Sequence, residues 1–201
     1  MQQVVPRLHP APDERTRREP FSARLVVSLD RRIYRLARHW LPATNAVLIA
    51  WLAAIVLAPV LRLAGSPALA RPIYALFSVL CHQDPTRSFA VGGHPLACCH
   101  RCAAIYGASA AAGLGYATLR GRVRRARPHE LAALLAPVVI DGLGGMVGLW
   151  ESTTLSRLAT GALAGVGVVW LLYPYLDDGF ARVRARLEAL FTRLAAEGRF
   201  G

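Results

Sequence analysis

Four uncharged or nearly uncharged apolar runs constrain this chain more than any other feature of its sequence. They cover residues 46–61, 103–119, 131–150 and 158–176, and the third contains a single acidic residue, Asp141. About 20 apolar helical residues cross the hydrocarbon core of a bilayer, a length that each run reaches with its flanking residues. Charged residues make up 18% of the chain and the mean hydropathy is +0.35, unlike a soluble domain. The sequence therefore predicts an all-α, polytopic membrane helix bundle with four transmembrane helices.

Arginine blocks between and beyond the runs predict the orientation of the bundle. The net charge is +12, and the basic residues concentrate in residues 1–43, 120–127 and 179–201. Basic segments next to spans stay on the cytoplasmic side. We therefore expect a multi-pass protein of the inner (cytoplasmic) membrane with both termini cytoplasmic. The blocks flank the apolar runs, so the expected partner is the lipid bilayer, and no nucleic-acid binding is expected.

A short apolar segment, residues 72–81, does not fit the pattern of full spans. Its ten residues are too few to cross a bilayer, and a fifth crossing would place the basic loop 120–127 outside the cell. We therefore expect a re-entrant segment or half-helix, with the loop 82–101 on the extracytoplasmic side. The expected organisation is a basic N-terminal segment with an interfacial helix (1–43), a transmembrane domain (44–178) and an amphipathic basic C-terminal helix (179–201).

Small residues spaced four apart predict close helix packing within the membrane. They form Gly107-x-x-x-Ala111, Gly144-x-x-x-Gly148 and Gly161-x-x-x-Gly165, one in each of the last three runs. Such pairs let two membrane helices approach closely, although an Ala- and Gly-rich chain also produces them by chance.

The residues with ligand chemistry are concentrated between the short segment and the second run. All four cysteines and three of the six histidines lie in residues 81–102. Cys99 and Cys102 form a C-x-x-C motif at the start of a helix, where residues three apart come together and the helix N-terminus favours thiolate. We expect Cys81, Cys99 and Cys102 to be metal ligands and zinc to be the metal. His82 is the first choice for the fourth ligand, with His94, Asp141 or water as alternatives.

Other roles for the same cysteines remain open. Three protein ligands and an open position are typical of catalytic zinc, whereas four protein ligands are typical of structural zinc. Thiol–disulfide exchange through Cys99 and Cys102 is a second hypothesis. A non-catalytic metal knot or disulfide that ties the loop to the bundle is a third.

Polar residues of the same membrane face complete the candidate site. Asp141 and Glu151 are acid/base candidates. Asp141 lies within the third run, where a carboxylate is costly unless it faces a polar cavity or a partner, and Glu151 lies in the turn between the third and fourth runs. An Arg or a backbone amide near Pro137 is the alternative partner for Asp141. We expect a lipid or an anionic small molecule as substrate, since arginine binds phosphate and carboxylate groups. The candidate substrate-binding residues are Gln83, Arg87, Ser88, Ser152, Thr153 and Arg157.

The motifs in residues 45–170 resemble a family of small predicted prokaryotic membrane proteins, domain of unknown function 2085. The resemblance implies a membrane protein but no activity. The chain departs from the family pattern at three places: Ala103-Ala104, Gly144-Gly145 and Thr154. The residues that carry the resemblance are Cys81, His82, Gln83, Arg87, Ser88, Cys99, Arg101, Cys102, Tyr106, Gly107, Asp141, Gly142, Ser152, Thr153, Arg157 and Gly161.

Overall fold

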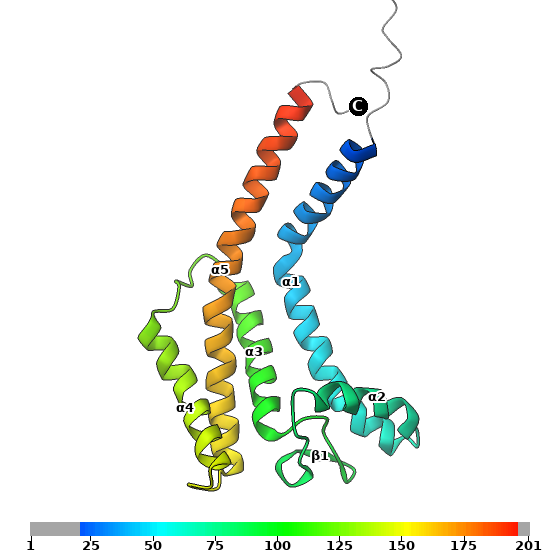
Figure 1. Cartoon of the computed structure of the whole chain (residues 1–201), viewed down its shortest axis with the longest axis vertical. Coiled ribbons are helices and arrows are strands. Elements are labelled where there is room, and N and C mark those ends of the chain that lie inside the picture. Colours follow the sequence, from blue (N-terminus) through cyan, green and yellow to red (C-terminus); the bar gives the residue numbers. More distant parts are fainter. Residues whose placement is uncertain (1–20, 197–201) are drawn as a thin grey trace, which may run out of the picture. The chain divides into compact units, whose positions relative to one another are not determined.

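A computed structural model describes residues 21–196 of the chain as an almost entirely helical protein. The ends of the predicted terminal segments, residues 1–20 and 197–201, lie outside this range. Five α-helices and a two-stranded hairpin make up the fold (Figure 1). Their bounds are α1 (Phe21–Leu63), α2 (Pro67–Ser78), the short helix η2 (Pro85–Arg87), β1 (Ala90–Val91), β2 (His94–Pro95), α3 (His100–Leu119), α4 (Pro128–Met146) and α5 (Thr154–Ala196).

Four of the helices are long and apolar enough to cross a membrane, which confirms the predicted fold class. The candidate spans are Ser28–Leu63, His100–Leu119, Pro128–Met146 and Thr154–Arg193. The shorter spans contain 19 and 20 residues, and at 1.5 Å per residue a helix of this size is about 30 Å long. The remaining helix, α2, has 12 residues and is too short to cross a membrane.

The short helix begins five residues earlier than the predicted segment 72–81 and ends three residues earlier. Pro67 occupies the first turn after Ser66, where its missing N–H costs nothing and its fixed φ suits a helix. Arg71 therefore lies inside α2, although in the sequence it stands directly before the apolar segment 72–81. Whether α2 is re-entrant stays a prediction.

The amphipathic end segments continue the helices of the first and last spans without a break. Helix α1 crosses the predicted boundary at residue 43, and α5 crosses the boundary at 178. Of the described residues, 21–38 and 183–196 belong to one compact unit, and residues 39–182 form the other. Within the first unit, the Tyr34 hydroxyl donates to Glu188 Oε1 at 2.9 Å, and Arg184 Nη1 donates to Ala37 O at 3.1 Å. The predicted interfacial position of these segments stays a prediction.

Glycines of α5 bring that helix into close contact with α3. A Cβ atom at Gly161 would lie 2.6 Å from Arg101 O, and one at Gly165 would lie 2.4 Å from Ile105 O. Ser109 Oγ also donates to Gly165 O at 3.2 Å. The helices lie side by side in Figure 1, and the Gly161-x-x-x-Gly165 pair acts as the small-residue contact that the sequence predicts.

The other two small-residue pairs do not bring helices together, so their prediction was wrong. A Cβ atom at Gly107 would meet nothing within 4 Å. Gly144 is covered by the Trp150 ring, whose Cζ2 would lie 2.1 Å from such a Cβ. Gly148 follows the end of α4 with a φ of +75°, a conformation that glycine adopts without steric cost.

A buried polar cluster links α1, α3 and α5 in the 39–182 unit. Asn45 Nδ2 donates to Gly113 O at 3.0 Å, and the Tyr173 hydroxyl donates to Asn45 Oδ1 at 2.9 Å. Asn45 is 5% exposed, so its amide needs these partners to offset the loss of water. Trp40 packs against Tyr173 with ring centroids 5.4 Å apart and extends the cluster.

We expect Gly165→Ala to destabilise the bundle by about 2 kcal/mol, because the new methyl group would overlap the α3 backbone. Thermal unfolding in detergent micelles measures the loss. Gly107→Ala is the matched control, since its methyl group meets open space. Equal unfolding temperatures for the two variants would contradict the close contact between α3 and α5.

Candidate metal centre

The loop between α2 and α3 folds back so that its two ends meet. Its centre is the hairpin β1–β2, in which Ala90 pairs with Pro95 and Val91 with His94. Gly92 and Gly93 form the two-residue turn with φ values of +56° and +81°, the left-handed conformation that favours glycine in tight hairpins. The hairpin returns the chain to the end of α2 and starts α3 beside Cys81.

Gln83 fixes the two ends of this loop. Its side-chain Nε2 donates to Tyr74 O of α2 and to Ala97 O before α3, both at 2.8 Å. Gln83 itself has a φ of +52°, which reverses the chain after Cys81. The amide predicted to bind substrate is thus hydrogen-bonded to the protein backbone.

Three cysteine sulfurs meet where the loop joins α3. The Sγ atoms of Cys81, Cys99 and Cys102 all lie within 4.8 Å of one another. All four cysteines of the chain are free. Among the described residues, this is the one group of three or more Cys, His, Asp or Glu side chains whose potential ligand atoms lie close enough together to share a metal ion. Sulfurs this close can hold a metal ion.

Hydrogen bonds favour the thiolate form at Cys99. The backbone N–H of Cys99 donates to Cys81 Sγ at 3.2 Å. The neighbouring Cys102 and Cys81 thiols hold the pKa of Cys99 below its usual range, and the backbone amides of Cys102 and Arg101 act in the same direction. Donors aimed at a sulfur stabilise its charged form, which is the form that binds metal.

Cys98 differs from its neighbours and stays outside the cluster, as expected from the sequence. Its side chain is fully buried in an apolar cluster with Ile55 and Phe77. Burial raises the pKa of Cys98 to about 12. A neutral thiol in this position is a small core side chain rather than a ligand.

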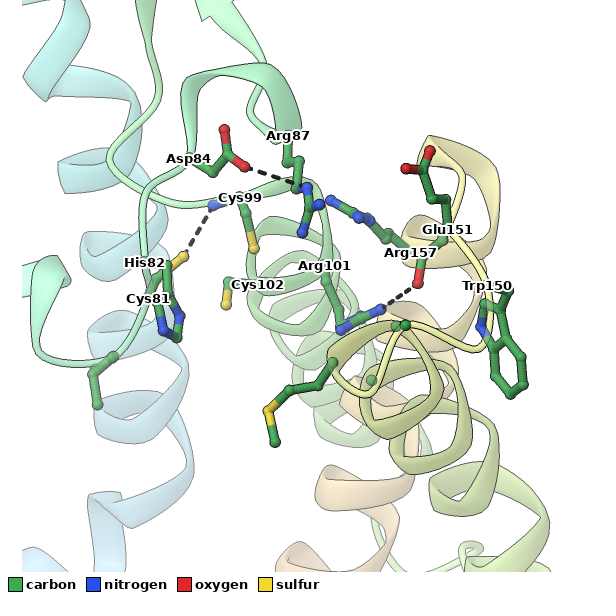
Figure 2. A pocket seen from close by; sticks show the side chains of 16 residues that line it. Cys81, His82, Asp84, Arg87, Cys99, Arg101, Cys102, Trp150, Glu151 and Arg157 are labelled. Carbon is green, nitrogen blue, oxygen red and sulfur yellow. Dashed lines mark hydrogen bonds and ion pairs between the residues drawn. The ribbon is translucent and has the colours of Figure 1, made fainter.

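A cavity of about 720 Å³ adjoins the three cysteines. Four parts of the chain line it: the loop after α2, the start of α3, the end of α4 with the connection that follows it, and the first turn of α5 (Figure 2). The cysteines and the connection 147–153 therefore share one end of the 39–182 unit. Apart from Leu80, Met146 and three glycines, the lining residues are Cys81, His82, Asp84, Arg87, Cys99, Arg101, Cys102, Trp150, Glu151, Ser152 and Arg157.

Asp141 forms an ion pair with Arg101 across α3 and α4. Arg101 Nη2 also donates to Ser152 Oγ at 3.3 Å, and Ser156 Oγ donates to Asp141 Oδ1 at 3.2 Å. Asp141 is 9% exposed, so these partners compensate for its burial. This is the Arg partnership that the sequence left open as an alternative to acid/base chemistry. The carboxylate is not among the described residues that line the cavity.

Two further arginines line the cavity, Arg87 from the loop after α2 and Arg157 from the first turn of α5. Arg87 Nε lies 3.3 Å from Asp84 Oδ2, and Thr86 holds the pKa of Asp84 below its usual range through hydrogen bonds, with smaller contributions from Arg87 and Arg157. Arg157 lies in the first turn of α5, and its buried Nε has no hydrogen-bond partner in the described residues. Figure 2 shows both guanidinium groups between Asp84 and Glu151.

The remaining predicted polar residues have structural contacts. Ser88 Oγ donates to Asp84 O at 2.8 Å, and Thr153 Oγ1 accepts the backbone N–H of Ser156 at 3.1 Å in the position of a helix cap. In the described chain, Ser88, Thr153 and Gln83 are absent from the cavity lining, whereas His82, Arg87, Glu151, Ser152 and Arg157 belong to it.

Sequence reasoning missed two contributors to this site. Asp84 pairs with Arg87 in the turn Asp84-Pro85-Thr86-Arg87, where its side chain accepts Thr86 N at 3.0 Å. That Asp-Pro pattern is a turn signal that could have identified the pair. Trp150 covers Gly144 and lines the cavity; no pattern in the sequence marks it, because its contact depends on the turn at Gly148.

Comparison with known proteins relates the site-bearing part of the chain to a family of predicted membrane proteins and to uncharacterized relatives. Residues 81–171 match the family model described as predicted membrane protein (DUF2085). An uncharacterized protein of Methanocaldococcus jannaschii is 36% identical over 104 residues, which are 51% of this chain and 67% of the relative. An uncharacterized protein of Methanothermobacter thermautotrophicus is 38% identical over 96 residues, which are 47% of this chain and 86% of the relative. No solved structure matches.

We expect Asp141→Asn to lower the free energy of unfolding by about 3 kcal/mol, because it leaves the Arg101 charge in the protein without its counterion. Thermal unfolding in detergent measures the change. Arg124→Gln, which breaks a more exposed pair with Glu130, is the control and is expected to cost less than about 1 kcal/mol. Losses of equal size would mean that the Arg101–Asp141 pair contributes no more than a surface pair.

Proposed function

This chain belongs to the predicted membrane protein family DUF2085, and from that premise we propose that it binds zinc through Cys81, Cys99 and Cys102. The observation that carries the proposal is the convergence of three free sulfurs within 4.8 Å of one another. Thiolates are zinc ligands with a Zn–S distance of about 2.3 Å, and tetrahedral binding places the sulfurs about 3.8 Å apart. Small side-chain rotations bring the three sulfurs to that spacing.

The fourth ligand position distinguishes a catalytic centre from a structural one. His82 lines the cavity beside the cysteines and is the protein side chain that we propose for this position in a closed site. Without it, the fourth position faces the cavity and takes water or substrate, which is the arrangement of catalytic zinc. Metal retention in His82→Ala decides between the two forms.

If the centre is catalytic, metal-assisted hydrolysis or group transfer on a membrane-embedded substrate is the chemistry that the lining supports. Zinc supplies a Lewis acid and lowers the pKa of bound water. Glu151 is the acid/base group that we propose, since it is a lining residue of the cavity. Asp141 is held by Arg101 and in this proposal positions that arginine.

We propose that the centre lies at the extracytoplasmic face of the inner membrane. The basic loop 120–127 joins the end of α3 to the start of α4. Cys99 precedes the start of α3 and Trp150 follows the end of α4, so both lie at the other end of these helices. Basic loops stay in the cytoplasm, so the cysteines would lie across the membrane from it. The continuity of α1 and α5 with their basic ends favours cytoplasmic positions for both termini.

Thiol–disulfide exchange is the second candidate function, and the position of the free Cys99 thiol at the N-terminal end of α3, with the free Cys102 one turn further on, favours it. A thiolate at a helix N-terminus attacks disulfides readily. In that case, thiol trapping in cells would find Cys99 and Cys102 in both oxidised and reduced forms, and the purified protein would lack stoichiometric metal.

We expect wild-type protein purified without chelators to contain one zinc ion per chain, measured by elemental analysis. Cys81→Ala, Cys99→Ala and Cys102→Ala each remove one of three thiolate ligands and are expected to lower the zinc content at least tenfold. Cys98→Ala is the matched control, because Cys98 adjoins Cys99 but lies in the apolar cluster. Its zinc content should equal that of the wild type. Absence of metal from the wild type, or equal loss in all four variants, would contradict the proposal.

We expect His82→Ala to retain one zinc ion per chain if the fourth position is open to the cavity. In a closed site, the variant would lose zinc to a chelator such as EDTA faster than the wild type. The rate of zinc release at a fixed chelator concentration measures the difference. His94→Ala is the control, because His94 lies in the hairpin and is not among the described residues that line the cavity.

A further inference from the structure

We infer that the cavity beside the cysteines binds the phosphate headgroup of an anionic membrane lipid, whose acyl chains leave across Leu80, Met146 and Trp150. The inference deepens the proposed function, because it names the substrate class that a metal at this site would meet. Binding of the headgroup requires the arginines and the apolar rim, not the metal.

Arg157 is the principal headgroup contact. Its guanidinium forms no hydrogen bond or ion pair of normal length with any residue in the range 21–196, although it acts electrostatically on Asp84. Its Nε is buried, and an unsatisfied buried donor on a charged group is costly. A phosphate in the cavity would supply the counterion that this guanidinium lacks, and guanidinium and phosphate match in a two-pronged geometry.

The surroundings of Arg157 add positive potential on the same side of the cavity. Arg87 approaches from the loop (Figure 2), and its pairing with Asp84 engages Nε, which leaves the two terminal nitrogens for a ligand. Helices α3 and α5 both begin at the cavity, and helix N-termini favour anions. Arg101 is already paired with Asp141, so we assign the headgroup to Arg157 and Arg87.

The cavity rim is apolar and open, which favours a lipid over a soluble anion. Leu80 is 56% exposed and Met146 is 79% exposed, and both line the cavity. Val79, Val147 and Leu149 continue this exposed apolar surface on either side. In a membrane protein, such a surface faces acyl chains, and a soluble phosphate gains nothing from it.

The size of the cavity fits a headgroup with the first part of its chains. A volume of about 720 Å³ lies within the range of small-molecule sites. Gly142, Gly145 and Gly148 face it from α4 and its end, so backbone rather than side chains forms that wall. The remaining acyl length would lie outside, along the exposed apolar surface.

The experiment measures binding of dioctanoyl phosphatidic acid to full-length protein in nanodiscs of zwitterionic phosphatidylcholine, by isothermal titration calorimetry. We expect Arg157→Gln to weaken binding at least tenfold. Arg122→Gln removes an equal charge from the exposed loop at the opposite end of α3 and is expected to leave the dissociation constant within twofold of wild type. Equal affinities of wild type and Arg157→Gln would overturn the inference.

Two further arms separate the sources of the phosphate and the role of the rim. Inorganic phosphate is expected to bind at least tenfold more weakly than the lipid; comparable affinity would mean a soluble anion and overturn the lipid assignment. Met146→Ser should weaken binding of the lipid severalfold without changing that of inorganic phosphate. An unchanged lipid affinity would contradict the exit path of the acyl chains.

Zinc content, measured in the same samples, keeps this inference distinct from the proposed metal site. If wild-type protein lacks zinc but binds the lipid with the expected dependence on Arg157, the headgroup site stands and the zinc proposal fails. If zinc is bound through the cysteines but Arg157→Gln binds the lipid as wild type does, the zinc proposal stands and the headgroup site fails.

Discussion

The close contact between α3 and α5 is the constraint on which the site depends. Gly161 allows the α5 backbone to reach the carbonyl oxygen of Arg101 in the first turn of α3. That contact sets Arg157 at the start of α5 opposite Cys99 and Cys102 at the start of α3. A side chain at Gly161 would separate the helices and move the arginine away from the cysteines. Packing inside the membrane thus determines which charges surround the sulfurs at its edge.

Charge pairing at both ends of the 39–182 unit follows from the cost of leaving ionised groups near lipid. At the cysteine end, Arg101 pairs with Asp141. At the opposite end, Arg120 and Arg125 pair with Asp177 and Asp178. Arg157 differs from these residues, because no carboxylate lies within ion-pair distance of it in the described chain. That difference distinguishes a candidate binding residue from residues that hold the bundle together.

Composition and spacing predicted the number of spans and the cysteine cluster, because both depend on local patterns. Apolar run length identified the spans, and the C-x-x-C motif at a helix start placed Cys99 beside Cys102. The joining of Cys81 to them depended on the Gln83 contacts and the Gly92-Gly93 turn, which pattern reasoning did not use. Glycine spacing predicted the contact at Gly161 and Gly165 but failed at Gly107 and Gly144, since spacing alone does not say which helix face meets a neighbour. The bond between Asp141 and Arg101 joins residues 40 apart. From the sequence, an arginine was only one of the alternative partners for Asp141.

The central claim is that Cys81, Cys99 and Cys102 bind one metal ion together. X-ray absorption at the zinc edge of the purified full-length protein tests it most directly, because it counts the ligand atoms around the metal. We predict three sulfur neighbours at about 2.3 Å with one nitrogen or oxygen neighbour. A shell of nitrogen and oxygen atoms without sulfur, or no bound metal, would contradict the account.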